Sequence, residues 1–103
     1  MIDLQPGHLG IVQAILREHV PDMEVRVFGS RVAGNAREAS DLDIAIVGKE
    51  KMDWELISRI RDAFSDSDLP MRVDVLDWAA ITETFRKVIE QGYEVIQKGR
   101  DGG

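Results

Sequence analysis

Two aspartates at the start of an apolar segment are the residues of this sequence best suited to do chemistry. Asp41 and Asp43 come just before residues 44–47, Ile-Ala-Ile-Val, a run that predicts a strand buried on both faces. Because alternate side chains of a strand point to the same face, the two carboxylates should lie about 6.5–7 Å apart along the strand and face one space. Like charges this close raise each other's pKa, and a divalent cation between them would relieve the repulsion. The pair therefore predicts a metal site.

A glycine turn comes before the aspartates. A predicted strand over residues 23–28 stops at Gly29 and Ser30, and the residues that follow are enough for only one or two helical turns. Gly29 lets the backbone approach a ligand closely, Ser30 adds a hydroxyl group, and the N–H groups at a helix N-terminus bind anions. An anion site that faces a cation site indicates a nucleoside triphosphate with Mg²⁺, since that ion is held by a few carboxylates and by phosphates.

A third carboxylate and two arginines complete the candidate site. A strand predicted over residues 71–76 carries Asp74, which is the candidate third metal ligand. Asp77 stands at the end of the same strand and is better explained as a helix N-cap. Arg31 and Arg37 lie in the loop before the aspartates, where guanidinium groups match phosphate geometry. We expect a phosphate role for both, and more for Arg31 than for Arg37.

Taken together, these motifs resemble the polymerase-beta-type nucleotidyltransferase superfamily, and within it the minimal nucleotidyltransferases (MNT proteins) that are paired with HEPN toxins. The likeness covers most of the chain and is densest over fifteen residues, where eight positions match: Gly29, Ser30, Arg31, Gly34, Arg37, Ser40, Asp41 and Asp43. The resemblance implies a nucleotidyltransferase fold. It also implies a nucleotide-binding set of Gly29, Ser30, Arg31, Arg37 and Ser40, and a catalytic, metal-binding set of Asp41, Asp43 and Asp74.

The expected reaction is transfer of AMP from ATP to a hydroxyl group, with release of pyrophosphate and with two Mg²⁺ ions. Asp41 and Asp43 would hold the nucleotide-bound ion and share the second, while Asp74 would bind the second and help deprotonate the acceptor. The resemblance implies a HEPN toxin as partner, neutralised in some cases by addition of AMP to a toxin tyrosine, so that this chain would be the antitoxin.

Two alternatives remain open at this stage. One is an enzyme for a small-molecule hydroxyl, in the manner of aminoglycoside nucleotidyltransferases, although those generally carry a second helical domain. The other is a catalytically silent module that neutralises a toxin by complex formation alone. Keeping three carboxylates in one apolar setting costs stability unless they bind metal, which favours catalysis over silent binding.

The rest of the chain predicts an α+β fold, with a small mixed sheet flanked by helices. Apolar stripes with spacings of three and four indicate helices over residues 9–20, 54–64 and 79–91. Asp53 is the expected N-cap of the second of these helices. In the third, Gly92 is the expected C′ cap, and the expected buried stripe is Ile81, Phe85, Val88 and Ile89. Alternating or apolar runs indicate strands over residues 23–28, 41–47, 71–76 and 93–96. The short connection between the first two strands predicts that they pair antiparallel.

Length and composition set the outer bounds. With 103 residues, we expect a single catalytic domain over 1–103, with residues 98–103 as a frayed tail. The 13 basic and 19 acidic residues give a net charge of −6, which argues against a nucleic-acid footprint. The absence of cysteine and of long apolar runs predicts a cytoplasmic protein that makes no membrane contact.

Overall fold

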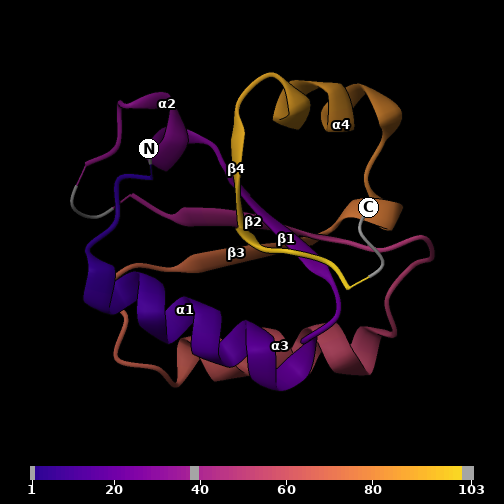
Figure 1. Cartoon of the computed structure of the whole chain (residues 1–103), viewed down its shortest axis with the longest axis horizontal. Helices are drawn as coiled ribbons and strands as arrows, with labels where there is room; N and C mark the ends of the chain where they lie inside the picture. Colours follow the sequence, from indigo (N-terminus) through magenta and orange to yellow (C-terminus); the bar gives the residue numbers. More distant parts are fainter. Residues whose placement is uncertain (1, 38–39, 101–103) are drawn as a thin grey trace.

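A four-stranded mixed sheet forms the centre of the computed structural model, which describes residues 2–37 and 40–100. The strands are β1 (Glu24–Phe28), β2 (Leu42–Val47), β3 (Val73–Asp77) and β4 (Tyr93–Gln97), in the spatial order β3-β2-β1-β4. β1 pairs antiparallel with both β2 and β4, whereas β2 and β3 run parallel. The mixed sheet and the antiparallel β1–β2 pairing confirm the sequence predictions (Figure 1).

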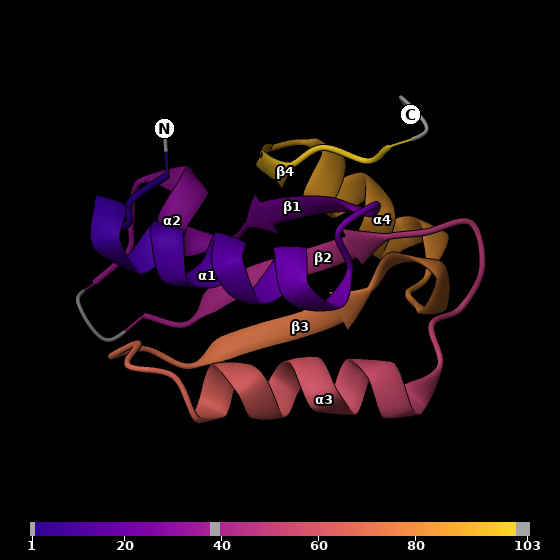
Figure 2. The same ribbon diagram turned by 60° about the horizontal axis from the view of Figure 1, so that its bottom comes forward.

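Two long helices cover one face of this sheet. Helix α1 (Pro6–His19) and helix α3 (Trp54–Ser65) lie together on that side, and α3 runs beneath β3 (Figure 2). Their buried residues form the main core with the inward side chains of the strands, among them Leu16, Ile44, Ile60 and Val75. Asp53 caps α3 as predicted, because its side chain accepts a hydrogen bond from Glu55 N. None of the helices in the described part of the chain is long and apolar enough to span a bilayer.

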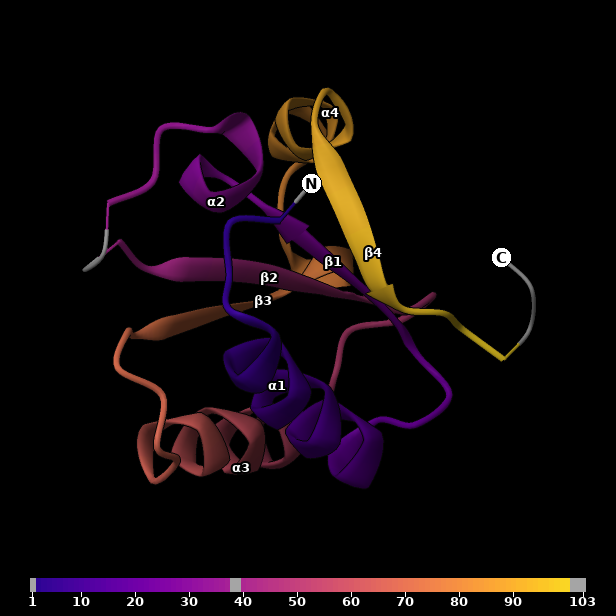
Figure 3. The same ribbon diagram turned by 60° about the vertical axis from the view of Figure 1, so that its left-hand side comes forward.

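The opposite face is covered only in part. The 3₁₀ turn η1 (Trp78–Ala80) and helix α4 (Glu83–Glu90) lie over it, and α2 (Ser30–Ala33) makes a single turn at the end of β1 (Figure 3). A small second core of Phe28, Ala45 and Ile89 joins α4 to the sheet. The carboxylates predicted from the sequence lie on this less covered face.

The helix predicted over residues 79–91 is wrong in its boundaries and in its buried stripe. Ile81 is extended, and the Thr82 hydroxyl accepts from Phe85 N, so a new helix begins at Glu83 after the short η1 turn. Of the expected apolar stripe only Ile89 is buried, whereas Val88 is 56% exposed. Gly92 does not adopt the left-handed conformation of a C′ cap, since Gly29 and Gly34 are the glycines with positive φ among the residues that the structure describes.

Part of the expected frayed tail, residues 98–100, lies within the described residues and makes two contacts. Arg100 N donates to Asp22 O at 3.0 Å, and the Arg100 guanidinium lies 3.4 Å from the Asp22 carboxylate. These contacts tie residues near position 100 to the turn before β1. Residues 101–103, the rest of the expected tail, lie outside the described residues.

Candidate active site

Three strand ends meet where the candidate site lies. Asp43 is opposite Phe28 of β1 on one side and opposite Asp74 of β3 on the other. Since β2 and β3 are parallel and in register here, the side chains of Asp43 and Asp74 point to the same face of the sheet. Asp41 is two residues before Asp43 and therefore belongs to the same row. The structure thus places the three predicted carboxylates at one edge of the less covered face.

The electrostatics of Asp43 reflect this crowding. Burial raises the pKa of the half-buried Asp43 carboxyl above its usual range, and the Asp74 and Asp41 carboxylates raise it further. The Arg72 guanidinium acts in the opposite direction. Arg72 Nη2 lies 3.3 Å from Asp41 Oδ2 in an exposed ion pair, so it compensates only part of the negative charge. Sequence reasoning missed Arg72, although its place just before the Asp74 strand is a usable signal.

Gly29 is required by the position of Asp43. It has φ 79° and ψ −154°, a conformation open to glycine and rarely to other residues. A Cβ atom added at Gly29 would overlap Asp43 Oδ2. The glycine of the turn therefore has two functions: it supplies the backbone conformation, and it leaves the space in which the Asp43 carboxylate lies beside the turn.

Arg31 occupies a different place from the one expected. Its side chain is buried, Nε and Nη2 donate to Ser40 O at 3.1 and 2.8 Å, and Nη1 donates to Asp3 O at 2.8 Å. The guanidinium thus ties the loop before the aspartates to the N-terminal segment. This geometry favours a positioning role over the phosphate contact predicted from the sequence, and it was not foreseeable from a local motif because Asp3 is distant in the chain.

The other predicted loop residues lie as follows. Ser40 closes a turn, since its hydroxyl accepts from Arg37 N at 2.8 Å, and its carbonyl is the one that Arg31 holds. The Arg37 side chain is exposed. Ser30 begins α2 next to Gly29. Ser30 therefore follows directly on the glycine that borders Asp43, whereas the Ser40 hydroxyl is used in the fold of its own loop.

Asp77 is not part of the carboxylate row. It is paired in register with Ile46, at the far end of β3 from Asp74, and is buried. Its two oxygens accept hydrogen bonds from Ala79 N at 3.1 Å and from Met52 N at 2.8 Å. The prediction that Asp77 is an N-cap is confirmed, for the η1 turn.

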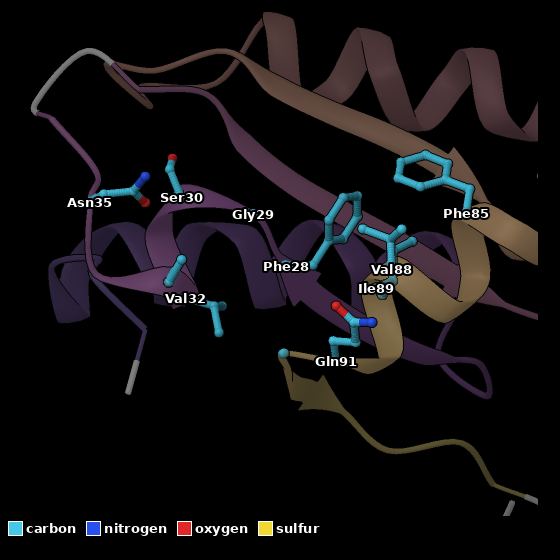
Figure 4. A pocket seen from close by; sticks show the side chains of 11 residues that line it. Phe28, Gly29, Ser30, Val32, Asn35, Phe85, Val88, Ile89 and Gln91 are labelled. Atoms are coloured by element: carbon cyan, nitrogen blue, oxygen red, sulfur yellow. The ribbon is translucent and has the colours of Figure 1, made fainter.

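A pocket of about 610 Å³ opens beside the glycine turn, between α2 and α4. Gly29, Ser30 and Asn35 line one side, while Phe28, Phe85 and Val88 form an apolar wall (Figure 4). The rings of Phe28 and Phe85 meet edge to face at 6.0 Å. The apolar periodicity of this segment predicts that Phe85 and Val88 are buried, whereas both are exposed and line this pocket.

The carboxylates do not form a ready-made metal cage. Across residues 2–37 and 40–100, no group of three His, Asp or Glu side chains is arranged so that it could hold an ion as it stands. Asp41 Oδ2 lies instead 3.3 Å from Arg72 Nη2. Asp43 and Asp74, by contrast, are neighbours across the sheet.

A mixed sheet that presents a glycine-serine turn and a row of strand aspartates at one edge defines the nucleotidyltransferase class of proteins. The family model described as "Polymerase beta, Nucleotidyltransferase" matches residues 12–101. The chain belongs to this family and is a nucleotidyltransferase.

Two relatives are similar to the chain in sequence, and a solved structure is similar to it in fold. The chain is 50% identical over 97 residues to the Haemophilus influenzae protein named "Probable protein adenylyltransferase MntA", covering 94% of this chain and 85% of that one. It is 32% identical over 87 residues to the Shewanella oneidensis "Protein adenylyltransferase MntA", covering 79% of this chain and 59% of that one. Its fold matches, at 21% identity and a TM-score of 0.61, a structure described as a tri-AMPylated Shewanella oneidensis HEPN toxin in complex with MNT antitoxin, covering 95% of this chain and 76% of that one.

Proposed function

We propose that this protein transfers AMP from ATP to a hydroxyl group of a HEPN-family toxin and so acts as the antitoxin of the pair. The observation that carries the proposal is the glycine turn at Gly29, which leaves space for Asp43 in register with Asp74. The relatives named as protein adenylyltransferases support the reaction, and the fold neighbour that contains an AMPylated HEPN toxin supports the partner.

The residues at this edge fit a magnesium-bound nucleotide. Burial and two neighbouring carboxylates raise the pKa of Asp43, which marks a concentration of negative charge suited to a hard cation. Asp41, Asp43 and Asp74 would hold the metal, with Asp41 giving up Arg72 for it. When bound, Mg²⁺ would neutralise part of the triphosphate charge and polarise the reacting oxygens.

The side chains of the protein then position the acceptor hydroxyl and remove its proton. The acceptor oxygen attacks the α-phosphorus of ATP, a new O–P bond forms, the bond to the bridging oxygen breaks, and pyrophosphate leaves. Asp74 accepts the hydroxyl proton, because it lies on the edge strand β3, in register with Asp43. Most of the acceleration comes from alignment and from charge placed in advance.

The pocket beside α2 is suited to the rest of the nucleotide. Ser30 offers its hydroxyl to the phosphates at the mouth of the pocket, and the apolar wall of Phe28, Phe85 and Val88 suits the flat face of a base. Arg31 acts indirectly: its guanidinium donates to Ser40 O and so holds the loop that leads into Asp41.

The test is a transfer assay with Mg²⁺ and ATP labelled at the α-phosphate, with and without the HEPN protein. We expect label on the HEPN protein and its loss in Asp43→Asn. Asp68→Asn is the matched control, since Asp66 and Asp68 have the same spacing in an exposed loop. A tight complex that stays unlabelled, and that is insensitive to Asp43→Asn, would instead establish neutralisation by binding alone.

A further inference from the structure

The outer edge of β3 is an open strand edge right next to the proposed catalytic carboxylate. β3 is the last strand of the sheet on its side. Arg72 O accepts from Leu42 N, so backbone groups at position 72 face β2, and those of Val73 and Val75 face outward. The bond from Arg61 Nη2 to Val75 O, at 2.9 Å, confirms that this carbonyl points away from the sheet.

A groove of about 530 Å³ runs along this edge. One wall is β3 itself, from Arg72 to Val75, and the other comes from Arg61, Phe64 and the loop after α3. Arg61 covers one outward carbonyl, as charged side chains often do on unpaired strand edges. Arg61 and Arg72 both line the groove, which gives it basic groups on a protein whose net charge is −6.

We propose that this edge receives the acceptor as an added β-strand: an extended, tyrosine-bearing segment of the partner protein, with acidic residues beside the tyrosine. This inference rests on the proposed function and specifies how its acceptor is presented. Pairing to the outward groups of Val73 and Val75 supplies the backbone hydrogen bonds of strand addition. The Arg61 guanidinium then pairs with an acidic side chain of the segment and no longer donates to Val75 O.

The register explains why this edge suits catalysis. The Asp74 backbone faces β2, so an antiparallel strand added outside places its opposite residue in a non-hydrogen-bonded pair, with Cα atoms about 4.5 Å apart. Directly opposite side chains of paired strands lie on the same face, and the Asp74 side chain lies on the face of Asp43. A tyrosine at that position of the added strand therefore extends along the carboxylate row, toward the α-phosphate.

The first test removes a single outward N–H group. Val73→Pro deletes the outward donor at the first residue of an edge strand, where proline leaves the pairing with β2 intact. Val73→Thr is the matched control, because it keeps the N–H group and nearly the same shape. We expect Val73→Pro to raise the KM for the HEPN partner at least tenfold, with little change in kcat. The KM of Val73→Thr for the partner should stay near the wild-type value. The rise in the melting temperature of Val73→Pro with Mg²⁺-ATP should also stay near the wild-type value.

Two further readouts separate the outcomes. In a complex with the HEPN protein and a non-hydrolysable ATP analogue, the amide protons of Val73 and Val75 should become protected from exchange, and that of Val95 on the other edge strand should not. Arg61→Glu should raise the KM for the partner by repelling acidic residues. An unchanged KM in Val73→Pro, or protection on β4 and α4 instead, overturns strand addition and leaves the transfer reaction standing. Absence of transfer by the wild type would overturn the proposed function itself.

Discussion

At the scale of single residues, Gly29 joins backbone conformation to catalysis. Gly29→Ala would strain a positive-φ position and push Asp43 Oδ2 from its place. We expect transfer activity to fall ~10²–10³-fold, the loss typical of misplacing one electrostatic group. Gly34→Ala separates the two effects, because Gly34 has φ 90° with open space around it. That control should lose about 1 kcal/mol of stability with activity largely kept. Equal activity in the two variants would contradict the role given to Gly29.

Asp43 makes the stability of the metal-free protein depend on pH. Its pKa is raised in the folded state by burial, then by Asp74 and Asp41, above the ordinary value of 3.8. At pH values between the ordinary pKa and the raised pKa of the folded state, the folded protein binds more protons than the unfolded chain. The Asp43 carboxyl therefore makes the free energy of unfolding fall as pH rises through this range. Asp43→Asn should therefore raise the melting temperature at neutral pH, and the gain should vanish below about pH 4. Melting curves without metal at both pH values test this, and a gain independent of pH would exclude the charge as its cause.

At the scale of elements, Arg31 holds the loop that leads into β2. Removing its side chain in Arg31→Ala leaves Ser40 O and Asp3 O without their donors, and we expect a loss of about 2–4 kcal/mol in unfolding free energy. Nucleotide affinity should fall with it, because the loop positions Asp41. The exposed Arg37 supplies the comparison, and Arg37→Ala should stay within about 0.5 kcal/mol of wild type. Chemical denaturation of both variants measures the difference.

The two aspartates of β3 should separate stability from chemistry. Asp77→Ala removes the acceptor for Ala79 N and Met52 N and should cost about 1–3 kcal/mol, with turnover near wild type. Asp74→Ala should show the reverse, with stability kept and transfer reduced ~10²–10³-fold. Denaturation and transfer rates measured on the same preparations give both values. Loss of turnover in Asp77→Ala alone would move the third carboxylate to that position.

The elements also show what the sequence could and could not predict. The Asp53 cap follows from a local pattern. The strand positions and the shared face of Asp43 and Asp74 do so too, because alternation fixes which face a strand residue occupies. The function of Arg31 depends on a contact with Asp3, 28 positions away, which no local pattern contains. The apolar stripe of α4 predicted burial, but Val88 lines a pocket, because α4 covers only part of its face of the sheet.

At the scale of the whole molecule, acidic charge is concentrated where the ligand must supply the counter-charge. The protein has a net charge of −6, and Arg72, in an exposed ion pair with Asp41, offsets only part of the charge of the carboxylate row. In a magnesium-bound nucleotide, the cation would pair with Asp41, Asp43 and Asp74. The phosphate anion would bind at the turn at Ser30. Metal and nucleotide should therefore bind cooperatively, each raising the affinity for the other.

This cooperativity predicts a thermal response of the entire fold. A ligand that binds only the folded state, at a hundred times its Kd, adds about 2.7 kcal/mol. For a domain of this size, that corresponds to a rise in melting temperature on the order of 10 °C. We expect this rise with Mg²⁺ and ATP together, a smaller rise with either alone, and a greatly reduced response in Asp43→Asn. A melting temperature that does not change on addition of Mg²⁺ and ATP together would exclude nucleotide binding at this edge, since any ligand that binds the folded state stabilises it by mass action.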